Sequence, residues 1–113
     1  MKSSGGCLCK AVRFSLTAAP LAARVCWCRV CQYLGAGNGA VSVCFRADTV
    51  SVQGDVKWFE SIADSGNRMQ RGFCPACGTP LFSRAESRPH LTFIRAGTLD
   101  DPNLMKPQMI SWP

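Results

Sequence analysis

The sequence predicts a single, mainly β domain built from short antiparallel strands. The chain has 113 residues, the usual size for one hydrophobic core. Hydrophobic residues make up 47% and charged residues 18% of it, a balance that excludes intrinsic disorder. Several short runs alternate polar with apolar residues, as strands with one buried face do. Because no linker, repeat or low-complexity tract interrupts them, residues 1–113 are expected to form one unit.

The predicted elements follow one another closely along the chain. The first strand is Ala11–Leu16, in which polar and apolar residues alternate. Further strands are predicted at Ala40–Phe45, Val50–Val52, Val56–Ser61, Arg68–Phe73 and Leu91–Ala96. Gly54-Asp55 predicts a tight turn between two of them. Arg29–Leu34 is the only helical candidate, and the glycine-rich stretch 35–39 after it predicts a flexible loop.

Cysteine is the residue type that carries the chemistry. Of eight cysteines, seven form three tight clusters and Cys44 stands alone. The clusters are a C-x-C, a C-x-C-x-x-C and a C-x-x-C, formed by Cys7 and Cys9, by Cys26, Cys28 and Cys31, and by Cys74 and Cys77. Such clusters suit a metal ion, because neighbouring thiolates can converge on one tetrahedral zinc at about 2.3 Å.

The last cluster has the strongest local signature. In the segment 73–78, Phe-Cys-Pro-Ala-Cys-Gly, Pro75 presets the turn between the two sulfurs, and Gly78 can adopt the positive φ that follows the second ligand. This punctuation is typical of a zinc knuckle, and a pair of free core cysteines would not require it. A knuckle supplies two ligands, so it needs a partner pair.

Two pairings complete a four-thiolate site. If the knuckle joins Cys7 and Cys9, the cysteines at 26, 28 and 31 are left as three ligands of a second ion with an open position, the arrangement of a reactive zinc. If it instead joins Cys28 and Cys31 as a zinc ribbon, three cysteines remain unexplained. Ligand economy favours the first pairing, with two Zn²⁺ per chain.

The cellular compartment bears on the alternative of disulfides. The residues after Met1 lead into no apolar signal segment, and no stretch approaches 18 apolar residues, so neither a signal peptide nor a membrane span is predicted. We therefore expect a cytoplasmic protein, where clustered cysteines are metal ligands more often than disulfides. A C-x-C pair is also poorly placed to bridge.

Charge gives only a weak indication of the partner. The formal net charge is +6, but seven zinc-bound thiolates and two Zn²⁺ would reduce it to about +3. The basic residues are scattered, with no long run of Lys or Arg. Nucleic-acid binding through a basic stripe is therefore not favoured.

Several single residues have two interpretations each. Cys44 lies in an apolar run and is expected to be buried and inert, with ligation of the second zinc as the alternative. His90, the only histidine, follows Pro89 in a polar stretch, which favours a surface position over acid–base chemistry.

Aromatic and arginine residues near the clusters are candidates for substrate contact. Trp27, Trp58 and Phe59 either line a pocket beside the second zinc or belong to the core. Arg29, Arg68 and Arg71 could bind the carboxylates of an anionic substrate, although each could equally face solvent. Among these, Trp27, Arg29 and Arg71 are the predicted substrate contacts.

Three segments together resemble the glutathione-dependent formaldehyde-activating enzyme (GFA) family. They are Gly5-Gly6-Cys7-Leu8-Cys9 with Ala11-Val12-Arg13-Phe14, then Cys26-x-Cys28-Arg29-x-Cys31-Gln32, and Phe73-Cys74-x-x-Cys77-Gly78-Thr79-Pro80-Leu81-Phe82. A fourth, Arg95-Ala96-Gly97-Thr98-Leu99-Asp100-Asp101, extends the resemblance over nearly the whole chain. The chain departs from the family pattern at Trp27, where members typically carry histidine, and at Lys10, where glycine is common.

The resemblance implies an Mss4-like β fold and two zinc ions. It implies a structural zinc on Cys7, Cys9, Cys74 and Cys77 and a second, reactive zinc on Cys26, Cys28 and Cys31. The implied activity is that of a carbon–sulfur lyase, an S-(hydroxymethyl)glutathione synthase-like enzyme acting on glutathione and formaldehyde.

Three functions remain open at this point. The first is the enzyme, in which a thiol at the open zinc position adds to a small aldehyde. The second is a non-catalytic zinc-binding module for protein or nucleic-acid interaction. The third is that both zinc ions are structural, since each bound zinc can supply about 10 kcal/mol of folding free energy.

Overall fold

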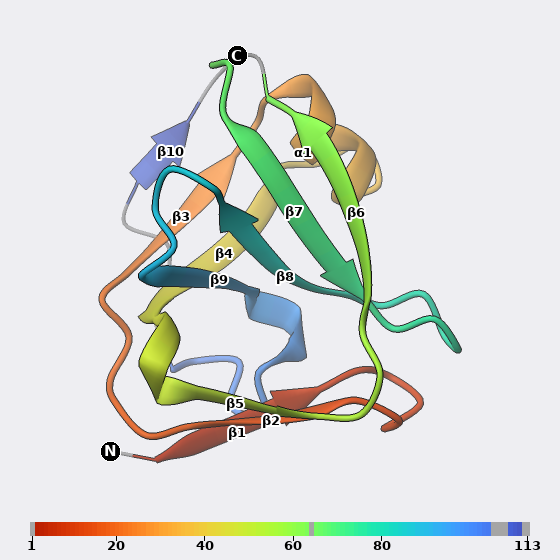
Figure 1. Cartoon of the computed structure of the whole chain (residues 1–113), viewed down its shortest axis with the longest axis vertical. Helices are drawn as coiled ribbons and strands as arrows, with labels where there is room; N and C mark the ends of the chain where they lie inside the picture. The colour runs from red at the N-terminus through yellow and green to blue at the C-terminus, as the bar shows by residue number, and fades with distance from the viewer. Residues whose placement is uncertain (1, 64, 105–108, 112–113) are drawn as a thin grey trace.

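The computed structural model describes residues 2–63 and 65–104, and the backbone of residues 109–111. Its smaller sheet is antiparallel, with the order β1-β2-β5, and consists of β1 (Ser3–Gly6), β2 (Arg13–Leu16) and β5 (Val50–Gln53). In Figure 1 this sheet lies below a larger one and crosses under it.

The larger sheet contains most of the strands, in the order β10-β3-β4-β9-β8-β7-β6. Their bounds are β3 (Ala22–Cys26), β4 (Ala40–Arg46), β6 (Lys57–Ile62), β7 (Arg68–Phe73), β8 (Pro80–Ala85), β9 (Leu91–Arg95) and β10 (Met109–Ser111). The helix α1 (Arg29–Leu34) lies at the end of this sheet that is remote from the smaller one (Figure 1). Two short 3-10 turns, η1 (Ala47–Thr49) and η2 (Ala96–Thr98), follow β4 and β9.

The mainly β class predicted from the sequence is confirmed, and so is the helix over Arg29–Leu34. The predicted strands all correspond to observed ones with small shifts at their ends; residue 96, for example, begins η2 instead of ending β9. Four strands were not predicted: β1, β3, β8 and β10. The pairing is antiparallel as expected, except that β10 runs parallel to β3.

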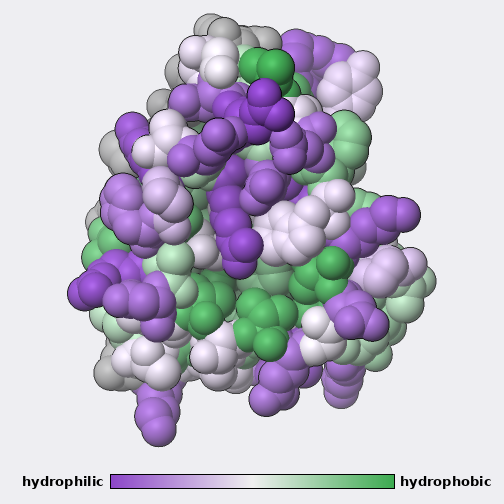
Figure 2. All heavy atoms as spheres, in the orientation of Figure 1, coloured by the Kyte–Doolittle hydropathy of each residue, from purple (hydrophilic) through white to green (hydrophobic). Residues whose placement is uncertain are grey.

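The hydrophobic core lies between the two sheets. Phe14 of β2 packs edge-on against Phe82 of β8, with ring centroids 5.5 Å apart. Trp58 of β6 stacks on the same Phe82 at 6.1 Å. Around them lie fully buried aliphatic and aromatic residues, including Val12, Leu16, Val43, Phe45, Leu81 and Ile94. Figure 2 shows hydrophobic side chains in a band below a strongly polar surface.

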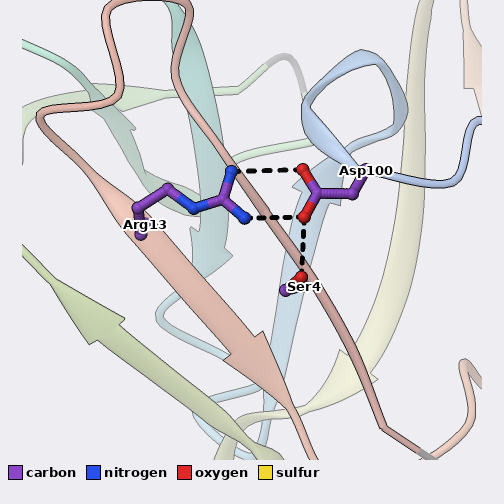
Figure 3. A network of polar contacts seen from close by, with 3 residues as sticks. All are labelled: Ser4, Arg13 and Asp100. Atoms are coloured by element: carbon purple, nitrogen blue, oxygen red, sulfur yellow. Dashed lines mark hydrogen bonds and ion pairs between the residues drawn. The ribbon is translucent and has the colours of Figure 1, made fainter.

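The small sheet is joined to the end of β9 by close packing and by one ion pair. A Cβ at Gly5 would collide with the carbonyl oxygen of Thr98, which explains a glycine inside a strand. Arg13 donates two hydrogen bonds to Asp100, at 3.1 and 2.6 Å, and the Ser4 hydroxyl donates a third at 2.6 Å (Figure 3). These contacts fix the segment that leads away from β9 against β1 and β2.

No helix among the described residues combines the length and the apolar character that crossing a bilayer requires.

Candidate metal centres

The first cysteine cluster lies where two strand connections meet. Cys7 and Cys9 lie between β1 and β2, and Cys74 and Cys77 lie between β7 and β8. Their four sulfur atoms all lie within 4.8 Å of one another. The Cys7–Cys9 and Cys9–Cys74 sulfur pairs are 3.6 and 3.8 Å apart. A tetrahedral zinc with Zn–S bonds of about 2.3 Å requires sulfur separations of about 3.8 Å, so this donor set fits zinc.

Hydrogen bonds orient the sulfurs of this cluster. The Val12 N–H donates to Cys7 Sγ at 3.3 Å. The Thr79 hydroxyl lies 3.0 Å from Cys77 Sγ, and its oxygen in turn accepts a hydrogen bond from the Leu8 N–H at 3.2 Å. Chiefly through the hydrogen bond with Thr79, the pKa of Cys77 falls to about 5. A thiol that ionises so readily is prepared for metal ligation.

In the two turns that carry the first cluster, one residue each has a positive φ, in the left-handed region of backbone conformation. Gly78 has a φ of 77°, the positive φ that the knuckle signature predicts. Lys10 has a φ of 69°, although it carries a side chain. The position at which this chain departs from the GFA pattern is thus one where the backbone itself favours glycine.

The first cluster belongs to the folded core. Cys74 is fully buried and Cys7 is 5% exposed, and both pack in the hydrophobic cluster between the sheets. Four sulfurs in a tetrahedral arrangement leave no position for a substrate. A metal ion here would therefore be structural and would link the start of the chain to its last third.

The second cluster is built on the start of α1. Cys26 ends β3, Cys28 is the N-cap residue of the helix, and Cys31 lies in the first turn. The Cys31 N–H donates to Cys28 Sγ at 3.4 Å, so a thiolate fills the usual role of a capping side chain. The three sulfurs lie within 4.8 Å of one another. The structure therefore places the seven cysteines in a set of four and a set of three. It does not bring Cys28 and Cys31 together with the knuckle cysteines, as a zinc ribbon would require.

Within this cluster, the pKa of Cys31 and the pKa of Cys28 are shifted in opposite directions. Burial, followed by the neighbouring sulfurs of Cys26 and Cys28, raises the pKa of Cys31 to about 12. At Cys28 burial opposes ionisation, but hydrogen bonds from the Cys31 N–H and from the neighbouring sulfurs lower the pKa. Three thiolates held this close need a cation between them, which again fits a metal ion.

The second cluster opens into a cavity of about 360 Å³ on one face of the larger sheet. Strand register explains which residues line it: Arg24 pairs with Ser42, and Ser42 with Arg95 on the far side of β4. Phe93 pairs with Ser83, and Ser83 with Arg71. Since paired residues share a face, these side chains surround one space. The volume is in the range of small-molecule sites.

Arginine dominates the charge of this cavity. Arg24, Arg71, Arg88 and Arg95 line it, and no Asp or Glu is among its described lining residues. Arg71 is 8% exposed and donates to Ser61 Oγ at 2.6 Å, while the Arg95 side chain donates to Ser42 Oγ at 2.8 Å. The Nε atoms of Arg71 and Arg95 are buried without a hydrogen-bond partner. The cavity is thus prepared for an anion.

Only one of the three predicted substrate contacts, Trp27, Arg29 and Arg71, lines the cavity. Arg71 lines the cavity, but Arg29 is exposed on α1, bonded to Gln32 at 3.0 Å and stacked on Tyr33. Trp27 packs beside Gly39 and does not line the cavity.

The remaining candidates lie outside the cavity. Trp58 stacks on the core residue Phe82 but is itself 37% exposed, and Phe59 is 60% exposed. His90 is exposed, as expected. Cys44 is buried in β4, also as expected, and joins neither cluster. Arg24, Arg88 and Arg95 were not predicted from the sequence as site residues, although Arg95 opens the fourth of the segments that resemble the GFA family.

Comparisons with known proteins identify the fold and the family of the chain. A search of the curated proteins finds no match. Among solved structures, the crystal structure of a Rhodobacter sphaeroides protein is similar, with a TM-score of 0.70 and 21% identity over 97% of this chain and 99% of that one. At that identity the likeness concerns the fold. The family model described as "Glutathione-dependent formaldehyde-activating enzyme" matches residues 2–113, so the chain belongs to the GFA family.

Proposed function

We propose that this chain is a zinc-dependent carbon–sulfur lyase that forms or breaks the adduct between a thiol, glutathione in the family's chemistry, and a small aldehyde such as formaldehyde. The observation that carries the proposal is the convergence of three cysteine sulfurs on an arginine-lined cavity of about 360 Å³. A tetrahedral ion held by these three protein ligands would have one position left for a substrate.

The chain's own residues would divide the work as follows. Cys26, Cys28 and Cys31 would hold the ion at the start of α1. Zinc bound there would lower the pKa of a thiol that occupies the open position, so that it is present as a thiolate at neutral pH. Arg71 would attract a carboxylate of the substrate and fix its orientation in the cavity.

The reaction itself needs no side-chain nucleophile. The thiol sulfur forms a bond to the carbonyl carbon of the aldehyde, the π electrons move to the carbonyl oxygen, and that oxygen receives the proton lost from sulfur. The product is an S-hydroxymethyl adduct, and the reverse sequence regenerates thiol and aldehyde. The cavity supplies proximity and charge complementarity, the two effects that such an addition requires.

Metal content and exchange kinetics test this proposal together. Wild-type protein is expected to hold two zinc ions, and Cys28→Ser to hold one with its fold retained. The rate of interconversion of free and hydroxymethylated glutathione, measured by exchange NMR above the uncatalysed rate, should fall to background in Cys28→Ser. Cys44→Ala is the matched control, because it removes a cysteine that belongs to neither cluster.

The same experiment separates the alternatives. Two zinc ions without any acceleration would contradict the enzyme and favour the non-catalytic module or two structural ions. A single zinc in the wild-type protein, or loss of the whole fold in Cys28→Ser, would contradict a separable reactive site.

Substrate charge can be tested through Arg71. With glutathione, Arg71→Met should raise KM about tenfold or more, as expected for loss of a charge-assisted contact. With 2-mercaptoethanol, which carries no carboxylate, the variant should behave like wild type. An equal effect on both thiols would show that Arg71 supports the fold of the site and does not bind the carboxylate.

A further inference from the structure

Among the described residues, no arginine that lines the cavity forms an ion pair with Asp or Glu. The ion pairs of the described residues are formed by Arg13, Arg46 and Arg68, none of which lines the cavity. A buried cation without an anionic partner is unfavourable, because hydrogen bonds to neutral hydroxyls such as those of Ser42 and Ser61 replace only part of its lost hydration. A bound anion would supply the negative charge that the described lining residues lack.

Arg95 lines the cavity together with the three cysteines of the second cluster. It ends β9 and pairs with Ser42, which in turn pairs with Arg24, two residues before Cys26 on β3. Burial lowers the pKa of Arg95, and the charges of Cys31 and Cys26 act in the opposite direction. Its hydrogen bond to Ser42 leaves the buried Nε without a partner.

The second metal centre would carry the complementary charge. Three thiolates and one Zn²⁺ sum to a charge of −1, and a fourth thiolate from a substrate makes it −2. The first centre, with four thiolates of its own, would carry −2, and Arg95 also lines a smaller cavity that includes Gly78, the residue after Cys77. The second centre differs in that its charge would change when a substrate thiolate binds.

We propose that Arg95 is a positioning residue that supplies the counter-charge of the three-cysteine centre, and so sets its affinity for zinc and for an anionic fourth ligand. This inference rests on the proposed function, because it requires that the second cluster binds a metal ion. Zinc binding releases the protons of the three thiols, so it takes the centre to a net charge of −1. At an effective dielectric of about 20 and a separation of about 10 Å, one positive unit charge stabilises a centre of charge −1 by roughly tenfold in affinity.

Zinc affinity provides a test that does not depend on catalysis. Protein with the first centre loaded is titrated against a chromophoric zinc chelator, and the dissociation constant of the second ion is measured. Arg95→Met is expected to weaken it about tenfold or more, and Arg95→Lys, which keeps the charge, to stay within about threefold of wild type. Arg46→Met is the control, because it removes the same charge from an exposed ion pair.

The variants also separate charge from packing. Ser42→Ala deletes the hydrogen bond of Arg95 but not its charge, so its effect should be much smaller than that of Arg95→Met. Equal effects of these two variants, or wild-type affinity in Arg95→Met, would overturn the inference. If Arg95→Met does not fold, Arg95→Gln makes the same charge comparison with a polar side chain.

The outcomes distinguish this inference from the proposed function. A second zinc bound equally well with and without the charge at Arg95 overturns the inference alone. A second zinc weakened in Arg95→Met, in a protein that does not accelerate adduct exchange, supports the inference and overturns the proposed function. Absence of any second zinc in the wild type overturns both.

Discussion

Replacing Cys74 by serine is expected to destabilise the domain as a whole, because this cysteine links parts of the chain that are far apart in sequence. Cys9 and Cys74, whose sulfurs are 3.8 Å apart, are separated by 65 positions. Closing a loop of that length through a covalent or metal link removes about 4 kcal/mol of chain entropy from the unfolded state. Since domains are stable by only about 5–15 kcal/mol, the loss would be a large fraction of the total.

Urea unfolding of the zinc-loaded proteins, followed by tryptophan fluorescence, measures this loss. With a urea dependence of about 1.5 kcal/mol per molar, 4 kcal/mol lowers the midpoint by roughly 2–3 M. Cys28→Ser is the matched comparison, because Cys28 and Cys31 are only 3 positions apart and their link closes a local loop. Its midpoint should fall by less than about 1 M.

Two results would refute this reasoning. If Cys74→Ser unfolds at nearly the wild-type midpoint, the four-cysteine centre does not hold the sheets together. If Cys28→Ser is as unstable as Cys74→Ser, the two centres do not differ in their structural role. Zinc analysis of each variant before unfolding shows which ion has been lost.

Three further predictions concern the backbone and the acid response. Gly5→Ala should lower the stability by about 2 kcal/mol or more in urea unfolding, because its Cβ would collide with the Thr98 carbonyl oxygen; a midpoint equal to that of wild type would contradict the close packing. Lys10→Gly should raise the stability by up to about 1 kcal/mol in the same assay, since its φ of 69° is unfavourable for a residue with a side chain. The Arg13 guanidinium lowers the pKa of Asp100 from 3.8 to about 2, so the resulting stability is complete above pH 4 and is lost as the pH falls toward 2; Asp100→Asn should flatten this part of the stability profile.

Local sequence pattern predicted the elements that have one apolar face or an evident cap. The helix over Arg29–Leu34 follows Cys28, whose side chain accepts the hydrogen bond of an N-cap, and a glycine follows its last residue. The strand β4 contains the run 40–45 that was predicted from its apolar residues. In such segments the residues that determine the local structure are neighbours in sequence, so the pattern is sufficient.

The missed strands depend on partners elsewhere in the chain. The strand β8 begins at Pro80, lies between β7 and β9 in the larger sheet, and has buried residues on both faces, at Leu81 and Phe82. It therefore lacks alternation, and proline is tolerated as its first residue. β1 is Ser-Ser-Gly-Gly, a poor strand sequence that becomes a strand because Gly5 and Gly6 allow close packing.

Most of the arginines that line the cavity were missed for a related reason. The cysteine clusters are visible because their members are close together in sequence, whereas Arg24, Arg71 and Arg95 come from three different strands. Each is an ordinary arginine until strand register brings it to the face that Cys26 shares. A polar residue recurring at every second position of otherwise apolar strands, as at Ser42 of β4, is the signal that such a face leaves in sequence.

The placement of these arginines also bears on the choice between enzyme and binding module. A protein that grips nucleic acid through phosphates needs cations on an accessible surface, each free to replace counterions. Here Arg13 and Arg68 are engaged by carboxylates, and Arg71 and Arg95 have buried Nε atoms in a cavity that three thiols share. The charges of Arg71 and Arg95 are therefore directed inward, to a space of small-molecule size. That arrangement favours a small anionic ligand over a polymer, and it does so independently of the family to which the chain belongs.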